Sequence, residues 1–188
     1  MLAHALNFFA AQYATVMAGP SIPDTFDFFL AEKYSDLRVL ATAIHLEWAT
    51  FLITPLFVYG TIFYPKKMIH FLILDILLVI FRAFAINLTH LGKVIGQPVI
   101  TGRDYTFGGD LFFSGHVAYT FLFFLIFRDT PVKYPVLIFH LIIMIATVIG
   151  RFHYAIDVVA AYAIAYSMYK FGVPRLERFL GAEKPILS

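Results

Sequence analysis

The sequence predicts an all-α integral membrane protein, a bundle of six transmembrane helices in a single domain over residues 1–188. Hydrophobic residues make up 61% of the chain and charged residues 14%, and the mean hydropathy of +0.81 lies outside the range of ordinary soluble domains. The apolar residues gather in long runs that Gly, Pro or polar residues separate. A span needs about 20 apolar residues, so the chain has room for roughly six.

Six apolar runs are the expected spans: about 2–18, 39–64, 68–91, 111–127, 134–149 and 153–171. The first run is the weakest, because Asn7, Gln12 and several small residues lower its hydrophobicity, and the alternative is that it lies in the membrane interface. Residues 20–37 contain helix-breaking Gly and Pro before a possible N-cap at Asp24, which predicts an interfacial loop and helix. The glycine-rich stretch 92–110 is expected to be a surface loop.

The distribution of Lys and Arg predicts the orientation, because the cytoplasmic loops of membrane proteins carry an excess of these residues. With six spans, the side of the two termini holds eight (Lys66, Lys67, Arg128, Lys133, Lys170, Arg175, Arg178 and Lys184) and the other side five (Lys33, Arg38, Lys93, Arg103 and Arg151). We therefore expect cytoplasmic N- and C-termini, with loop 92–110 and turn 150–152 on the non-cytoplasmic face. If the first run does not span, only the N-terminus changes side.

A polar cluster at the start of the last run suggests nucleophilic chemistry. His153 and Asp157 are four residues apart, so in a helix their side chains lie one turn apart on one face. The carboxylate can accept a proton from one imidazole nitrogen and leave the other free as a nucleophile. Arg151 is suited to bind phosphate, because its planar, permanently charged guanidinium can donate hydrogen bonds to two phosphate oxygens. The alternative is that His153 and Asp157 only pair inside the bundle and Arg151 only sets the topology.

A second cluster, Ser114-Gly115-His116, stands at the entrance of the fourth run, on the same membrane face as His153. Backbone amides at a helix start, together with the Ser114 hydroxyl, could cradle an anion at Ser114 and Gly115. His116 could protonate a leaving oxygen and later take a proton from an incoming alcohol or water. Taken alone, this cluster is equally consistent with ordinary residues at the start of a helix. Both clusters together indicate phosphate chemistry on a lipid.

These residues resemble a known family. The stretch Gly-Asp-Leu-Phe-Phe-Ser-Gly-His at 109–116, followed by His-Tyr-Ala-Ile-Asp-Val at 153–158, is similar to the sphingomyelin synthase family within the type 2 phosphatidic acid phosphatase superfamily. Arg82 with the residues up to Leu91 resembles the family's arginine-bearing segment at the end of its third span. The segment from Ile22 to Phe29 resembles its Pro-Asp segment. The resemblance covers roughly residues 20–171.

The resemblance implies a lipid phosphotransferase, an enzyme that moves a phosphorylated headgroup from a glycerophospholipid to an alcohol such as ceramide. His153 would attack phosphorus and form a phosphohistidine, Asp157 would orient it, and His116 would protonate the leaving alcohol. Arg82 and Arg151 would bind the phosphate in place of a metal, with Asp110 supporting the site from behind. The implied partners are the bilayer, a phospholipid donor and a lipid alcohol or water, with no cofactor, metal or nucleic acid.

Departures from the superfamily patterns favour the synthase-like branch. The phosphatase branch usually has a Lys followed seven residues later by Arg-Pro, which this chain lacks, and its Pro-Ser-Gly-His has Phe113 in place of Pro. Its Ser-Arg pair, five residues before a His, is reduced to Gly150 and Arg151 with one residue before His153. Against the synthase branch, Gly108 replaces a common Cys. The alternative function is therefore a lipid phosphatase or phospholipase C-type hydrolase with the same His, His and Asp.

Other polar residues inside the runs are expected to face the bundle interior. Arg82 and Asp75 are seven residues apart and so lie on the same face of a helix. We expect Arg82 to close the phosphate site from below, or else to pair with an acidic residue of another helix. His140 is expected to be a core histidine with satisfied hydrogen bonds, and His45 and Glu47 to make hydrogen bonds or headgroup contacts. A remote alternative is a haem-binding electron carrier, since histidines on facing spans can ligate haem.

Overall fold

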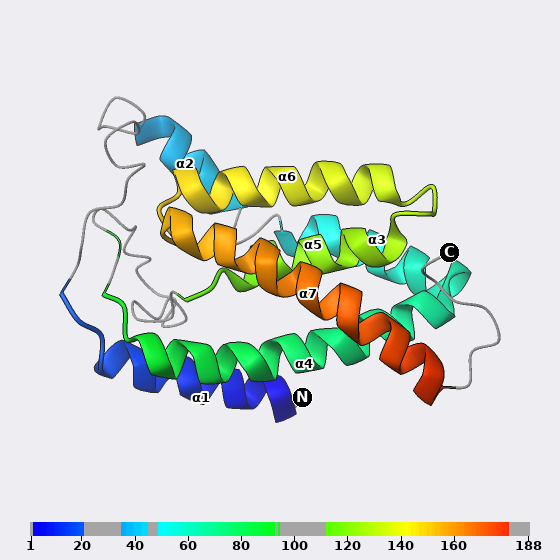
Figure 1. Cartoon of the computed structure of the whole chain (residues 1–188). Coiled ribbons are helices and arrows are strands. Elements are labelled where there is room, and N and C mark those ends of the chain that lie inside the picture. The colour runs from blue at the N-terminus through cyan, green and yellow to red at the C-terminus, as the bar shows by residue number, and fades with distance from the viewer. Residues whose placement is uncertain (1, 21–34, 45–48, 93, 95–111, 181–188) are drawn as a thin grey trace.

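The computed structural model describes residues 2–20, 35–44, 49–92, 94 and 112–180. These residues form seven helices, which confirms the all-α prediction for this part of the chain (Figure 1). The helices are α1 (Leu2–Val16), α2 (Ser35–Ala43), α3 (Ala49–Phe63), α4 (Pro65–Thr89), α5 (Gly115–Phe127), α6 (Lys133–Ile149) and α7 (Ala155–Phe179).

The helices follow the predicted runs with three differences. The run 39–64 falls on two helices, α2 and α3, with 45–48 outside the described residues, and the run 111–127 becomes helical only at Gly115. The last run continues beyond 171, since α7 extends to Phe179 with Pro174 inside it. Most of the expected interfacial segment 20–37 and of the loop 92–110 lies outside the described residues.

The long helices run along one common direction, and α5 lies in their middle (Figure 1). It packs against α4, α6 and α7, and most of its side chains are buried. This placement follows from its sequence, because a helix that is apolar all round is stable only where neighbours cover every face. The main core contains Phe71 and Leu74 of α4, Phe123 of α5 and Ala161 of α7.

Helix α1 packs along α4, and both helices end at the same end of the bundle, where the Gly19 amide donates to the His90 carbonyl at 3.0 Å. The buried residues of α1 are the alanines 3, 11 and 14, which are small enough for a close approach of two helices. Helix α4 begins with Pro65, whose fixed φ suits the first helical turn, and His90 ends it in a left-handed conformation with φ 40°.

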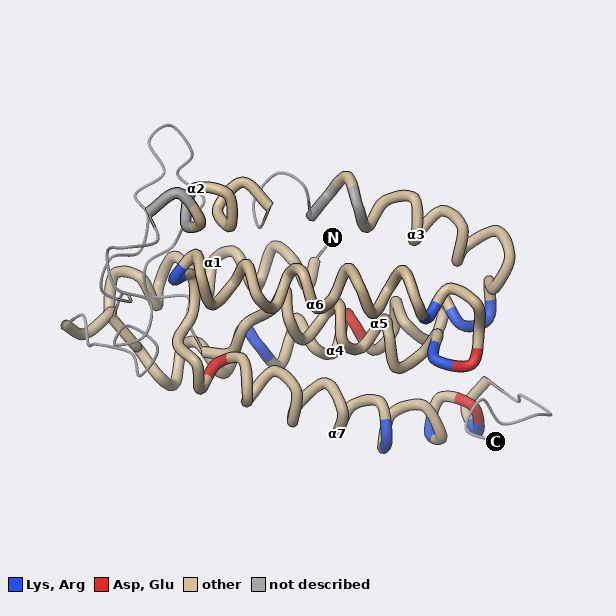
Figure 2. Tube along the Cα trace, turned by 90° about the horizontal axis from the view of Figure 1, so that it is seen from above, with Lys and Arg blue, Asp and Glu red and all other residues tan. Residues whose placement is uncertain are grey.

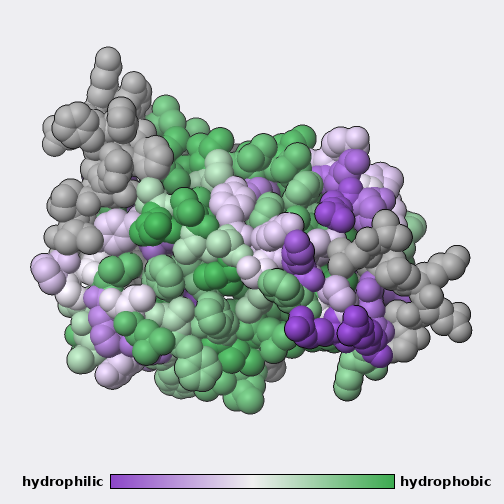
Figure 3. All heavy atoms as spheres, in the orientation of Figure 1, coloured by the Kyte–Doolittle hydropathy of each residue, from purple (hydrophilic) through white to green (hydrophobic). Residues whose placement is uncertain are grey.

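One described helix, α4, is long and apolar enough to cross a membrane, and the apolar stretches in α3, α5 and α6 are shorter. This agrees with membrane association. The described surface also carries large apolar side chains that are strongly exposed, such as Phe51 at 77% and Leu88 at 83%. Figure 3 shows apolar side chains spread over the middle of one face, with polar residues gathered toward the ends of the molecule. In water an apolar surface of this extent would be unfavourable.

Charged residues concentrate at one end of the bundle, where α4 begins, α5 turns into α6 and α7 ends (Figure 2). Lys67 and Asp129 form an ion pair there, with 2.6 Å between Nζ and Oδ1, and the Arg128 guanidinium lies 5.3 Å from the centre of the Tyr169 ring. The opposite end holds the starts of α5 and α7 (Figure 1). We call these the charged end and the α5/α7 entry end.

His140 has hydrogen-bond partners on both imidazole nitrogens, as the sequence predicts for a core histidine. Its Nδ1 lies 2.8 Å from the Thr120 hydroxyl of α5, and its Nε2 lies 2.7 Å from the Tyr162 hydroxyl of α7. The imidazole of α6 thus joins three helices. Since both nitrogens are occupied, His140 is a structural residue.

We expect His140→Leu to destabilise the bundle by about 1–2 kcal/mol, the range of a hydrogen bond between helices in a membrane. The measurement is thermal unfolding of the purified protein in detergent. The double variant His140→Leu/Tyr162→Phe should lose less stability than the two single variants lose together, because it removes both partners of one hydrogen bond. Strict additivity would show that the contact contributes nothing.

Candidate active site

The entry of α7 is built around the Asp157 carboxylate. Helix α7 begins at Ala155 after the cap residue Tyr154, and Asp157 is the third residue of the helix. Its Oδ2 accepts a hydrogen bond of 3.0 Å from the Tyr154 backbone amide, as in a capping box. A negative charge in the first helical turn also complements the helix dipole. The carboxylate therefore stabilises the start of α7 and is held rigidly by it.

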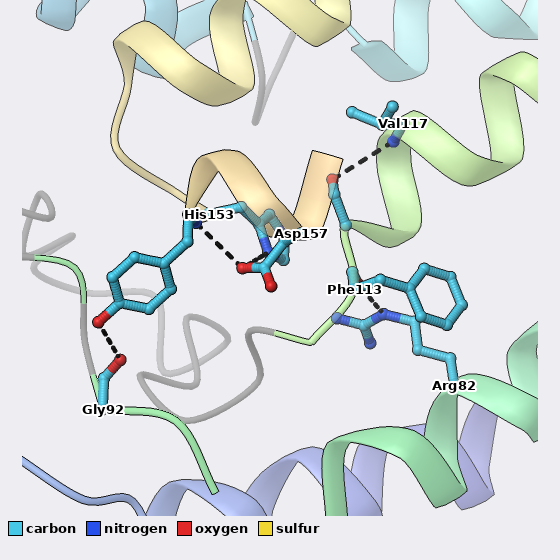
Figure 4. A network of polar contacts seen from close by, with 8 residues as sticks. Arg82, Gly92, Phe113, Val117, His153 and Asp157 are labelled. Atoms are coloured by element: carbon cyan, nitrogen blue, oxygen red, sulfur yellow. Dashed lines mark hydrogen bonds and ion pairs between the residues drawn. The ribbon is translucent and has the colours of Figure 1, made fainter. Parts of the chain in front are cut away.

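The same oxygen faces His153. The distance from His153 Nδ1 to Asp157 Oδ2 is 3.5 Å, and both side chains are buried, with 7% and 0% exposed. The contact expected from the spacing is present, although His153 lies two residues before the helix and not on it. Asp157 reaches it because the capping geometry turns the carboxylate back toward the preceding residues (Figure 4). With Nδ1 directed at the carboxylate, the nucleophile expected from the sequence is the other ring nitrogen, Nε2.

The entry of α5 is tied directly to that of α7. Ser114 is fully buried and caps α5, with its hydroxyl accepting from the Val117 amide at 3.4 Å. Its own amide donates to the backbone carbonyl of Asp157 at 3.3 Å. The two helix N-termini, each with a partial positive charge, are thereby held side by side.

Arg82 lies against the chain just before α5, in the interior of the protein. Its Nε donates to the Phe113 carbonyl at 3.0 Å and its Nη1 donates to the Asn7 side chain at 3.2 Å. Figure 4 shows Arg82 and Asp157 on either side of the segment through Phe113. Both of these contacts are with neutral groups, and a role for Arg82 at the phosphate site stays a prediction.

Gly115 has no side chain, and the Arg82 side chain lies close to where its Cβ atom would be. A Cβ atom at this position would lie 3.0 Å from Arg82 Nε and 3.3 Å from Cδ. A methyl group at the first helical residue of α5 would therefore push the Arg82 side chain from this position by a few tenths of an ångström. The Ser-Gly pair of the sequence motif thus has two separate physical roles, one in capping and one in clearance.

His116 and Arg151 complete the set that the sequence singles out. The His116 side chain is exposed and lies close enough to His153 and Arg82 to interact electrostatically with both. Arg151 is partly buried and adopts a left-handed backbone conformation with φ 57°, and its amide donates to the Val148 carbonyl. The structure thus brings His116, His153 and Arg82 together. Asp110 lies outside the described residues, as do His45 and Glu47.

Sequence reasoning missed two residues that support this site. The sequence presents Asn7 only as a polar residue in a weak span, yet its side-chain oxygen accepts a hydrogen bond from Arg82. The sequence presents Tyr154 only as part of a motif, yet its buried hydroxyl donates to the Gly92 carbonyl at 2.9 Å and ties the end of α4 to the start of α7. A signal for Asn7 exists, because it shares a helical face with Ala3, Ala11 and Ala14.

Asp75 does not pair with Arg82. Its Oδ2 lies 3.8 Å from His4 Nε2, and its other oxygen has no hydrogen-bond partner among the described residues. The described part of the chain contains no group of three or more His, Cys, Asp or Glu residues that could hold a metal ion.

Comparison with known proteins supports one assignment. Residues 108–173 match the family model described as PAP2 superfamily C-terminal. The search of curated proteins and the search of solved structures give no match. The matched segment contains both entry motifs, and it supports the type 2 phosphatidic acid phosphatase superfamily. Members of that superfamily are phosphatases or phosphotransferases, so the match supports enzymatic chemistry on lipid phosphates at the superfamily level.

We expect Gly115→Ala to weaken the binding of inorganic phosphate by about tenfold, because its methyl group displaces the Arg82 guanidinium and a charged hydrogen bond carries about 1.5–3 kcal/mol. Isothermal titration of the detergent-solubilised protein measures this. Gly19→Ala is the matched control, since a Cβ there meets its nearest atom at 3.5 Å, an ordinary contact. Equal phosphate affinity in both variants would contradict the clearance argument.

Proposed function

We propose that this protein is a lipid phosphotransferase that moves a phosphorylated headgroup from a glycerophospholipid to a lipid alcohol through a phosphohistidine. The observation that carries the proposal is the buried contact between His153 Nδ1 and Asp157 Oδ2, which in the proposed mechanism orients the imidazole for attack by Nε2. The match to the PAP2 superfamily model supports phosphoryl chemistry. The finer assignment to the sphingomyelin synthase-like branch rests on the motif at 109–116 and the short spacing between Arg151 and His153.

In the first step, His153 Nε2 attacks phosphorus and a P–N bond forms. The bond between phosphorus and the diacylglycerol oxygen breaks, and His116 gives its proton to that oxygen. The imidazole of His153 becomes positively charged, and the Asp157 carboxylate stabilises this charge. Arg82 and Arg151 offset the negative charge of the phosphate oxygens, the role that a metal ion has in other phosphotransferases.

In the second step, the hydroxyl of a ceramide-like acceptor loses its proton to His116 as its oxygen attacks phosphorus. The P–N bond breaks, His153 returns to its starting state, and His116 is protonated for the next turnover. If water takes the place of the alcohol, the same residues perform hydrolysis. The alternative of a lipid phosphatase or phospholipase C-type enzyme therefore differs only in the acceptor.

The proposed setting is a multi-pass membrane protein with six spans, both termini in the cytoplasm and the active site on the non-cytoplasmic face. The charged end then faces the cytoplasm, in accord with the positive-inside rule, and the α5/α7 entry end faces outward. Supporting this, large exposed apolar side chains lie on α1, α3, α4, α6 and α7. A lipid could reach the entry end from the bilayer without leaving it.

We expect His153→Ala to abolish turnover of a fluorescent phosphatidylcholine or phosphatidylethanolamine, because no nucleophile remains, while its unfolding temperature stays near that of wild type. His116→Ala should lower kcat by about 10²- to 10⁴-fold, the usual contribution of general acid–base catalysis. Asp157→Asn keeps an acceptor for the Tyr154 amide but loses the charge beside His153, so activity should fall more than stability. Full activity of His153→Ala would refute the phosphohistidine route.

The acceptor is tested by incubating wild-type protein in liposomes with headgroup-labelled phospholipid, with and without ceramide. We expect the label to appear in a sphingolipid only when ceramide is present, together with an equal amount of diacylglycerol. The same preparation of His153→Ala is the matched control. Water-soluble labelled phosphate or phosphorylated headgroup, formed at the same rate with and without ceramide, would assign the protein to the hydrolase alternative.

A further inference from the structure

We infer that Asn7 of α1 is a positioning residue of the active site, which orients the Arg82 guanidinium for the phosphate of the lipid substrate. This inference rests on the proposed function for its substrate. The starting observation is the hydrogen bond of 3.2 Å from Arg82 Nη1 to the Asn7 side-chain oxygen, between residues 75 positions apart in the chain.

Two hydrogen bonds fix the orientation of a guanidinium group, whereas a single hydrogen bond does not. The group is planar and rigid, so a single hydrogen bond through Nε still permits tilting about that contact. Arg82 Nε is bound to the Phe113 carbonyl at the entrance of α5, and Nη1 is bound to Asn7 on the far side. The second bond fixes the plane of the charge relative to the α5 entrance. The Asn7 amide is neutral, so it holds the guanidinium without cancelling the charge that phosphate needs.

The placement of Asn7 on α1 supports this role. The helix is buried against α4 through Ala3, Ala11 and Ala14, and Asn7 stands between these alanines on the same face. A stripe of small residues lets the two helix backbones approach closely, which brings a short side chain within reach of Arg82. One turn away His4 faces Asp75, with 3.8 Å between Nε2 and Oδ2. Arg82 is 8% exposed, so bulk water competes little with its bonds to Asn7 and Phe113.

Burial increases the effect of this bond on binding. Inside a membrane protein the effective dielectric constant is low, so a displaced guanidinium loses more interaction energy with a phosphate than it would in water. The preorganised position also lowers the ordering that substrate binding requires. Asn7 would therefore affect phosphate affinity and kcat without touching the substrate.

The test is a double-mutant cycle on phosphate binding. Inorganic phosphate is titrated into wild type, Asn7→Ala, Arg82→Ala and the double variant by isothermal calorimetry in detergent. We expect Asn7→Ala to weaken phosphate binding about tenfold, and to have no further effect once Arg82 is replaced. Gln12→Ala is the matched control, because Gln12 is an exposed polar residue of the same helix. If Asn7→Ala lowers phosphate affinity by the same factor in wild type and in Arg82→Ala, the inference is overturned. It is also overturned if the wild-type protein binds no phosphate.

A second variant separates positioning from helix packing. Asn7→Asp has nearly the same shape and keeps an acceptor for Arg82, so the unfolding temperature should not fall. Its negative charge competes with phosphate for the guanidinium, and phosphate affinity should drop at least as far as in Asn7→Ala. Wild-type affinity in Asn7→Asp would overturn the inference. Coupling in the binding cycle together with absent lipid turnover in wild type would instead refute the proposed function alone.

Discussion

The carboxylate of Asp157 is the group on which the rest of the site depends. One oxygen accepts from the Tyr154 amide and faces His153 Nδ1, and the backbone carbonyl of the same residue accepts from the Ser114 amide. A single residue thus starts α7, orients the imidazole and attaches the entrance of α5. Because its side chain is fully buried, the carboxylate charge is not screened by water, which strengthens its contacts with the Tyr154 amide and His153.

A second layer of contacts brings distant parts of the chain to this carboxylate. Arg82 comes from α4, its partner Asn7 from α1, and the Tyr154 hydroxyl binds Gly92 just after α4. The proposed anion site therefore combines two helix N-termini with a guanidinium between α1 and α5. In this arrangement the positive groups would be fixed before a substrate arrives, so that little reorganisation accompanies the development of charge in a transition state.

The sequence predicted what depends on local spacing. The four-residue step from His153 to Asp157 and the Ser-Gly pair before an apolar run indicated the imidazole contact and the start of a helix, and both are present. The contacts between distant segments could not be predicted, because nothing in a single sequence pairs Asn7 with Arg82 or Ser114 with Asp157. Hydropathy also could not locate the start of α5 at Gly115, since the preceding Leu111, Phe112 and Phe113 are as apolar as the helix itself.

That later start has a physical consequence for lipid chemistry. At 1.5 Å per residue, the 13 residues of α5 extend about 20 Å, less than the roughly 30 Å of a bilayer core. In the proposed six-span arrangement its N-terminus would lie recessed within the bundle, where non-helical backbone is tolerated only if protein groups satisfy it. Arg82 satisfies the Phe113 carbonyl, and Asp157 satisfies the Ser114 amide. In the proposed mechanism these two residues also lie at the phosphate, so the same residues would satisfy the backbone before α5 and build the anion site.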